Sequence, residues 1–102
     1  MPFVEIEKDY NDWIKIGENK ISIPKKIRDK YFTEENGGTR ARLFYDEENS
    51  LFGIKPSQDG YKIDRFGRIT CRRLPPLEKN KYFYFWDEDE KMLVVDLLAT
   101  KS

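Results

Sequence analysis

The chain contains the same pattern twice, and this internal duplication constrains its fold more than any other feature. The segment 43–54 (LFYDEENSLFGI) aligns without a gap with the later segment 84–95 (YFWDEDEKMLVV). Upstream, 20–25 (KISIPK) aligns with 68–73 (RITCRR). The two alignments have different offsets, and the difference falls in connecting segments, where deletions are tolerated best. The duplication therefore predicts one domain built from two similar halves.

Within each half, runs rich in β-branched and aromatic residues alternate with turn sequences. In the first half we expect a hairpin, one or two helical turns after Pro24, and a second hairpin, with strands at 13–16, 20–23, 40–45 and 51–55. In the second half we expect strands at 61–63, 68–71, 81–86 and 91–98. A further short strand is expected at 3–7. Pro75 and Pro76 prevent a helix at the position that corresponds to the helix of the first half.

The predicted fold class is mostly β (α+β). The single domain, 1–102, consists of two pseudo-symmetric β-β-(short α)-β-β repeats, 1–55 and 60–102, joined by a linker at 56–59. A pair of hairpins is not stable alone. We therefore expect the two repeats to bury their apolar faces against each other as one barrel or sandwich.

Composition narrows the cellular setting and the partners. Lys plus Arg equals Asp plus Glu at 19 each, so net charge does not point to nucleic acid or to a membrane. Charged residues make up 37% of the chain, against ~25% in ordinary soluble domains. Such a composition is typical of proteins from hot environments. The lone cysteine, Cys71, fits a reducing compartment, and neither a signal peptide nor a membrane-spanning stretch is visible. We expect a cytoplasmic protein without a membrane partner.

The residues needed for common catalytic chemistry are missing from the sequence. There is no histidine and one cysteine, so Ser-His and Cys-His nucleophiles and thiolate metal sites are excluded. Gly37-Gly38 lacks the rest of a phosphate-binding loop, and the acidic turns at 46–48 and 87–90 lack the spacing of a calcium loop. We therefore expect no enzyme activity, no cofactor, no metal and no small-molecule substrate.

The motif at each hairpin and helix resembles a known family. Ile21-Ser22-Ile23-Pro24, followed by Ile27-Arg28, and the second-half segment 63–70 (IDRFGRIT) each match part of the AbrB/MazE swapped-hairpin β-barrel motif. This resemblance implies DNA binding or capture of a toxin partner, in a chain similar to one family dimer fused end to end. Within the motif, Arg68 matches the arginine of the Gly-Arg turn, and Arg28 matches the arginine of the short helix.

The whole chain also resembles small proteins of filamentous viruses that infect the hot-spring archaeon Acidianus. That resemblance implies the host cytoplasm as the location and brings no activity with it.

The strand expected at Tyr82-Phe83-Tyr84-Phe85-Trp86 is aromatic on both faces, although a small sandwich needs only one apolar face. The surplus, whether Tyr82, Tyr84 and Trp86 or else Phe83 and Phe85, is either buried by the other repeat or exposed as a binding patch. Aromatic anchors beside an exposed strand edge fit a peptide partner. We expect a non-enzymatic protein- or peptide-interaction module with a groove between the repeats, contacted by Trp13, Tyr82, Tyr84 and Trp86.

The alternative function is an AbrB-like DNA-binding regulator. Basic residues cluster in both halves, although Glu18, Asp29 and Asp64 are interleaved among them. Neutralising phosphates with such a cluster would give a steep salt dependence. The nucleic-acid-binding residues of this alternative are Lys25, Lys26, Arg28, Arg68, Arg72 and Arg73.

Overall fold

The computed structural model describes residues 13–75 and 77–100, and the strand expected at 3–7 lies outside them. The elements are β1 (Ile14–Gly17), β2 (Lys20–Ser22), α1 (Lys25–Tyr31), a 3₁₀ turn η1 (Glu34–Asn36), β3 (Arg40–Asp46), β4 (Leu51–Ser57), β5 (Arg68–Thr70), β6 (Asn80–Asp87) and β7 (Met92–Thr100). The predicted mostly β class is confirmed.

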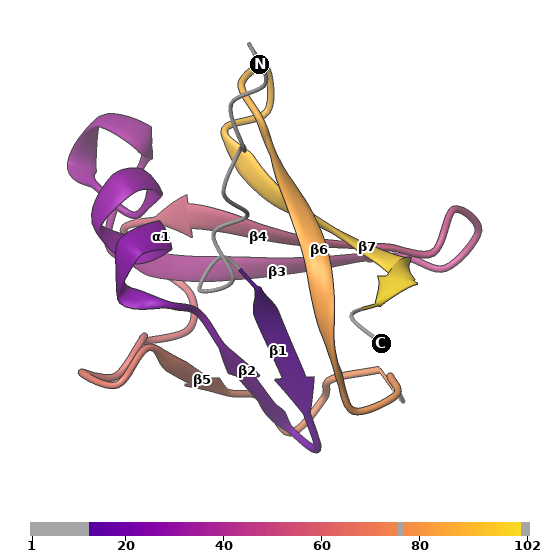
Figure 1. Ribbon diagram of the computed structural model, residues 1–102. Helices are drawn as coiled ribbons and strands as arrows, with labels where there is room; N and C mark the ends of the chain where they lie inside the picture. Colours follow the sequence, from indigo (N-terminus) through magenta and orange to yellow (C-terminus); the bar gives the residue numbers. More distant parts are fainter. Residues whose placement is uncertain (1–12, 76, 101–102) are drawn as a thin grey trace, which may run out of the picture.

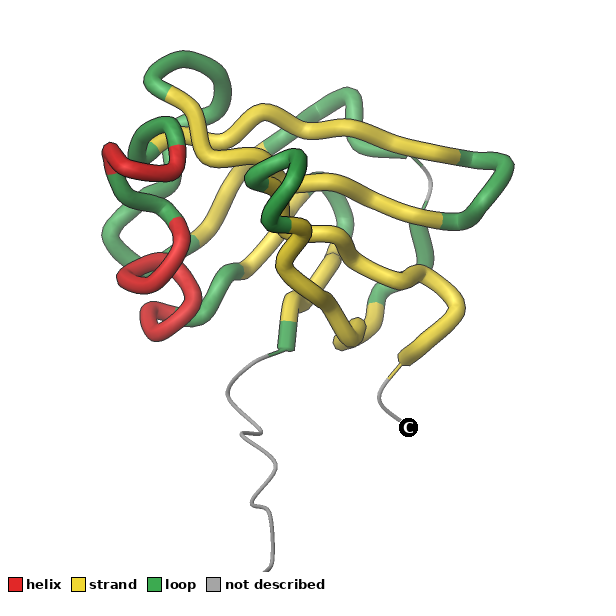
Figure 2. Tube along the Cα trace, turned by 90° about the horizontal axis from the view of Figure 1, so that it is seen from above, coloured by secondary structure: helices red, strands yellow, loops and turns green. Residues whose placement is uncertain are grey.

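These strands form one antiparallel sheet in the order β3-β4-β7-β6-β1-β2-β5. The sheet curls into a half-barrel whose strands bend around a shared interior, with α1 at one side (Figures 1 and 2). The two end strands of the sheet are β3 and β5, and the segment that precedes β5 contacts β3. Tyr61 exchanges two backbone hydrogen bonds with Ala41 of β3, with N–O distances of 2.7 and 2.9 Å.

Three elements differ from the sequence prediction by two residues, and the other strand ends differ by at most one residue. The strand expected at 61–63 shortens to the single bridge at Tyr61, because the chain then turns from Asp64 to Gly67, where the Gly67 amide donates to the Asp64 carbonyl (2.9 Å). β4 continues through Pro56 and Ser57, two residues expected in the linker, since they pair with Ala41 and Arg40 of β3. β7 continues to Thr100 instead of ending at Leu98.

The core fills the concave side of the sheet. Successive side chains along a strand point to opposite faces of the sheet, so every second residue points toward the interior. Most of these inward residues are branched aliphatic, and the completely buried ones include Ile14, Ile16, Ile21, Ile54, Ile69, Leu93 and Val95. Ile27 of α1 and Phe32 just after it close one end of this core. Cys71 is buried beside it, and its thiol donates to Tyr61 Oη (3.2 Å).

Two seams of the sheet join segments that the sequence aligns with each other. In the β2–β5 seam Ile21 lies opposite Ile69, its counterpart in the other half. In the β4–β7 seam Gly53 lies opposite Val94, again its counterpart in the alignment. At the centre of each seam, therefore, a residue pairs with the residue that the sequence alignment matches to it.

Candidate functional site

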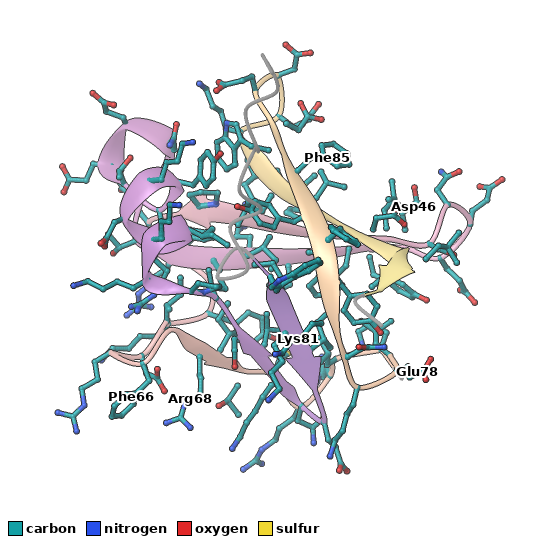
Figure 3. The ribbon with its side chains drawn as sticks, viewed as in Figure 1. Asp46, Phe66, Arg68, Glu78, Lys81 and Phe85 are labelled. Atoms are coloured by element: carbon teal, nitrogen blue, oxygen red, sulfur yellow. The ribbon has the colours of Figure 1, made fainter. Side chains whose placement is uncertain are left out.

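A groove with a volume of about 740 Å³ crosses the outer surface of β6, β1, β2 and β5. The first half of the chain lines the middle of the groove through β1 and β2, and the second half lines its two sides through β6 and β5. Its charged lining consists of five cations and one acidic residue: Lys15, Lys20, Arg68, Lys79, Lys81 and Glu18. We call it the cationic groove. Figure 3 shows Lys81 and Arg68 in the lower part of the molecule, and Asp46 far from them at the end of another hairpin.

Strand pairing places part of this charge in a straight row. Lys81 of β6 lies opposite Lys15 of β1, which in turn lies opposite Ser22 of β2. Ser22 lies opposite Arg68 of β5, which completes the row. Lys15 and Lys81 have no carboxylate partner among the described residues, and like charges directly opposite each other destabilise a sheet. An anion bound across the row would relieve this repulsion.

The Arg68 end of the groove is held by a tight turn. The Asp64 carboxylate accepts hydrogen bonds from the backbone N–H groups of Arg68 and Phe66, both at 2.9 Å. These bonds, the one from Arg68 first, together with the nearby Arg68 charge, hold the pKa of Asp64 below its usual value. Phe66, 61% exposed, lies beside the guanidinium groups of Arg65 and Arg68, 4.8 and 5.0 Å from its ring centre. The turn thus fixes a cation and an exposed aromatic ring next to the groove.

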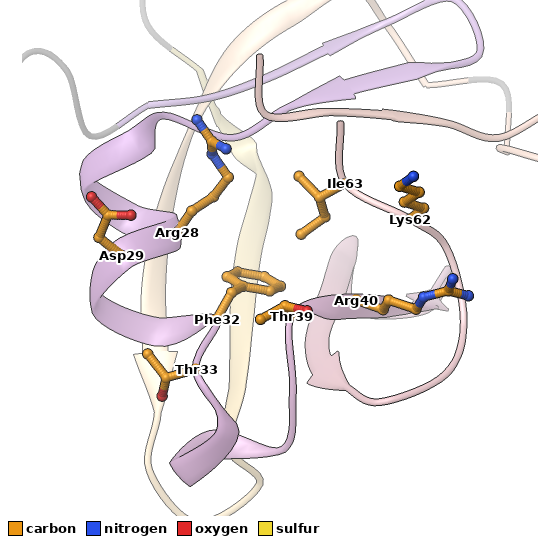
Figure 4. A pocket seen from close by; sticks show the side chains of 8 residues that line it. All are labelled: Arg28, Asp29, Phe32, Thr33, Thr39, Arg40, Lys62 and Ile63. Atoms are coloured by element: carbon orange, nitrogen blue, oxygen red, sulfur yellow. The ribbon is translucent and has the colours of Figure 1, made fainter. Parts of the chain in front are cut away.

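A second, smaller pocket of about 460 Å³ lies between α1, the start of β3 and the segment before β5 (Figure 4). Three cations line it, Arg28, Arg40 and Lys62, together with Asp29 and the apolar side chain of Ile63. The Nε atom of Arg28 is buried beside Gly67 without a hydrogen-bond partner among the residues that the structure describes. This second pocket therefore also favours a negatively charged group.

The four aromatic residues predicted to contact a partner are packed into the fold and line neither cavity. Tyr82 is 2% exposed, and its hydroxyl donates to the carbonyl of Glu78. Tyr84 and Trp86 are half-buried against the core, and Trp86 stacks on Tyr31 of α1 at 4.4 Å.

Trp13 is half-buried and meets the ring of Phe83 edge-on at 4.2 Å. The exposed aromatic side of β6 consists of Phe83 and Phe85, at 43% and 53%. Of the two alternatives for this strand, the structure places Tyr82, Tyr84 and Trp86 inside.

Two of the six basic residues of the DNA-binding alternative line a described cavity. Arg68 lines the cationic groove, and Arg28 lines the second pocket. The other four are exposed elsewhere, on α1 and in the turn after β5: Lys25, Lys26, Arg72 and Arg73.

Sequence reasoning missed Lys15, Lys79 and Lys81 as groove residues. Lys15 stands between Ile14 and Ile16, an alternation that marks it as outward-facing. The pairing of β1 with β6, which brings Lys15 to Lys81, joins distant segments and has no local signal.

The described residues contain no group of His, Cys, Asp and Glu side chains arranged to hold a metal ion. No helix in the part of the chain that the structure describes is long and apolar enough to cross a bilayer. Comparison of the chain with protein-family models, with curated proteins and with solved structures finds no match in any of the three.

Proposed function

We propose that this protein is a non-enzymatic interaction module that holds an acidic segment of a partner protein in the cationic groove, between its two halves. The observation that carries the proposal is the lining of that groove, which has five cations against one acidic residue in a chain with no net charge. Such segregation of charge, with Lys15 and Lys81 directly opposite each other, costs stability. An anionic partner would compensate for that cost.

The proposal includes a pseudo-two-fold arrangement of the halves 1–55 and 60–102, and several backbone details support it. The Ile23 amide donates to the Gly67 carbonyl, and its counterpart Cys71 donates to the Asn19 carbonyl, at 2.7 and 2.9 Å. The same two turns contain the positive-φ residues Asn19 (58°) and Gly67 (81°). These equivalent features, with the centred β2–β5 and β4–β7 registers, put the cationic groove between two related halves.

A peptide fits the groove in size and chemistry. Ligand-binding pockets have volumes of roughly 300–1,000 Å³, and the groove falls inside this range. Lysine ammonium groups donate three hydrogen bonds each, and bonds to carboxylates are stronger than those between neutral groups. Because the four aromatic residues predicted to contact a partner do not line the groove, the carboxylate side chains of the peptide would supply most of the affinity. The module would work in the cytoplasm, as the buried Cys71 and the lack of a disulfide pattern favour.

Nucleic acid is the second candidate, and the extension of positive charge beyond the groove favours it. The segment before β5 runs from Lys62 in the second pocket to Arg68 in the groove, so cations line both cavities. Phosphates spaced along a strand could follow such a path, and the exposed ring of Phe66 beside it could stack on a base.

Fluorescence anisotropy distinguishes these candidates. A labelled peptide rich in Asp and Glu, a labelled DNA duplex and a labelled single strand are each titrated with the protein at several salt concentrations. The proposal expects tighter binding to the peptide. It also expects that Lys15→Gln and Lys81→Gln each weaken binding about tenfold, since a hydrogen bond to a charged group contributes about 1.5 kcal/mol.

Lys25→Gln, on the exposed surface of α1, is the matched control and should leave peptide binding unchanged. Binding to duplex or single-stranded DNA alone, with a steep salt dependence, would replace the peptide by nucleic acid as the partner. No binding to any probe at low salt would contradict both candidates.

A further inference from the structure

The outer side of β3 is a long edge with unused backbone hydrogen-bonding groups. On this side Ala41 is bridged to Tyr61, and no described residue pairs with the rest of the strand. Because backbone groups alternate along a strand, those of Leu43 and Tyr45 point the same way as those of Ala41, away from β4. Phe44 and Tyr45 are 48% and 43% exposed. A long, exposed edge with apolar side chains is a template for pairing with another chain.

The charges along this edge are self-complementary. Arg42 and Asp46 are both exposed and lie two residues on either side of Phe44. In an antiparallel pair of identical strands centred on Phe44, Arg42 of each copy lies opposite Asp46 of the other. We propose that two copies of this chain associate through their β3 edges in this register, to make one continuous sheet.

The residues whose backbone groups point outward from the edge are the ones that this register pairs through hydrogen bonds. Leu43 of one copy would exchange backbone hydrogen bonds with Tyr45 of the other, and these are the groups that point outward. Phe44 would meet its own equivalent, and Arg42 would meet Asp46, at the closer, non-hydrogen-bonded positions where side chains interact most. A pair centred on Leu43 would need Ala41, which is already bonded to Tyr61. A pair centred on Tyr45 would place Phe44 opposite Asp46, and it would place Arg42 opposite position 48, in the hairpin turn beyond the end of β3.

Existing contacts leave both charged groups able to form the new ion pairs. Arg42 Nε lies 3.3 Å from Asp59 Oδ1, and a guanidinium has further N–H donors. Asp46 accepts hydrogen bonds from the Asn49 backbone and side chain, and a carboxylate has lone pairs to spare. β3 does not line the cationic groove, so association is independent of the proposed function.

Engineered cysteines test the register in the full-length chain. In the proposed pair the two Phe44 Cα atoms lie about 4.5 Å apart, which is within the range that a disulfide spans. Phe44→Cys should therefore form a disulfide-linked dimer under mild oxidation. Phe85→Cys, a similarly exposed aromatic position in β6, is the matched control and should form no disulfide-linked dimer. Equal cross-linking of the two variants, or none at Phe44→Cys, would overturn the proposal.

A charge exchange tests the ion pairs by sedimentation. The unmodified protein should dimerise, and Arg42→Glu should raise its dissociation constant at least tenfold, because it places two carboxylates opposite each other. Asp46→Lys should do the same, because it places two cations opposite each other. An equal mixture of the two variants should form a heterodimer, since the introduced glutamate then faces the introduced lysine, and the remaining Arg42 faces the remaining Asp46.

Circular dichroism checks that each variant is folded, and Arg42→Glu alone remains decisive if the loss of the Asp46 turn contacts unfolds the other. A monomeric unmodified protein at all concentrations, or an Arg42→Glu variant that dimerises as well as the unmodified chain, contradicts the proposal.

Discussion

The hairpins β3–β4 and β6–β7 have the same turn but different neighbours. In each, an aspartate at the end of the first strand, Asp46 or Asp87, accepts backbone hydrogen bonds from the turn. In each, the residue before the second strand, Ser50 or Lys91, has a φ of 53°. Yet β6 is covered by β1 along three residue pairs, whereas one bridge covers the outer side of β3 among the described residues. Turn chemistry thus determines the hairpin, and the connecting segments determine which surface stays open.

The connecting segments explain the asymmetry between the two halves. In the first half, α1 brings Ile27 into the core, and Phe32 follows it. In the second half, Pro75 and Pro76 rule out a helix, and the shorter path leaves Leu74 and Leu77 half-buried against the core. That path enters β6 beside the cationic groove, with Lys79 in the lining. The sheet therefore serves as a scaffold, and the unequal connections create both candidate surfaces.

The largest expected effect comes from the paired core positions Ile21 and Ile69. Both are completely buried and lie opposite each other in the β2–β5 seam. Ile21→Ala and Ile69→Ala should each lower the free energy of unfolding by about 2–5 kcal/mol, through lost burial and the cavity left behind. Urea denaturation measures both. If the two decreases in the free energy of unfolding differ by more than the spread of repeated measurements, the two halves are not equivalent at this seam.

A smaller effect separates the equivalent turn positions Asn19 and Gly67. Gly67→Ala should cost about 1–3 kcal/mol, because a Cβ at this positive φ is strained and would overlap the Ile23 carbonyl oxygen. Asn19→Gly should be neutral or slightly stabilising, since glycine adopts a positive φ without strain. Thermal unfolding of the two variants provides the measurement. Tolerance of alanine at Gly67 would mean that the two turns are less alike than their hydrogen bonds indicate.

Lys81→Glu should separate stability from binding. The substitution puts a carboxylate opposite Lys15, which converts a repulsive cross-strand pair into an attractive one. We expect the free energy of unfolding to rise by about 0.2–1 kcal/mol, while affinity for an acidic peptide falls. Calorimetry and fluorescence anisotropy measure the two effects. A variant that loses stability would show that Lys81 has a structural role instead of a binding role.

The smallest expected effect is the pH dependence contributed by the aspartates of two turns. The Asn49 side chain and backbone lower the pKa of Asp46, and backbone hydrogen bonding, first from Arg68, lowers the pKa of Asp64. Since both folded pKa values lie below the ordinary 3.8, this stabilisation is present above that pH and is lost as the pH falls through the folded values. Asp46→Asn and Asp64→Asn should each flatten the pH profile of urea unfolding in that acidic window, and an unchanged profile would contradict the assignment.

The fold was largely predictable because its signals are local. Alternation at Ile14 and Ile16, the acidic hairpin turns and Pro24 before α1 each act over a few residues. The single bridge at Tyr61 was not predictable, because it depends on how far the curled sheet brings β3 toward the chain before β5. The extension of β4 through Pro56 depends on its pairing with β3 and is equally non-local.

The candidate site was much less predictable than the fold. Arg68 was identified through its turn, whereas Lys15 and Lys81 become neighbours only when β1 pairs with β6. The sequence of the aromatic strand predicted its two alternative faces, Tyr82, Tyr84 and Trp86 or Phe83 and Phe85. It did not predict which face is exposed, because a shift of one residue in register exchanges the two faces. Burial of Tyr82 and exposure of Phe85 follow from that register alone.

The contact between Cys71 and Tyr61 gives the molecule a built-in reporter of its own fluctuations. Tyr61 carries both the hydroxyl that accepts from the thiol and the backbone groups that bridge to Ala41. Opening of that bridge would also expose the buried thiol, so the rate of alkylation of Cys71 measures how often the contact between Tyr61 and Ala41 opens. With no other thiol in the chain, the label reports on Cys71 alone, and its rate relative to that of a free thiol gives the free energy of the opening that exposes this side chain.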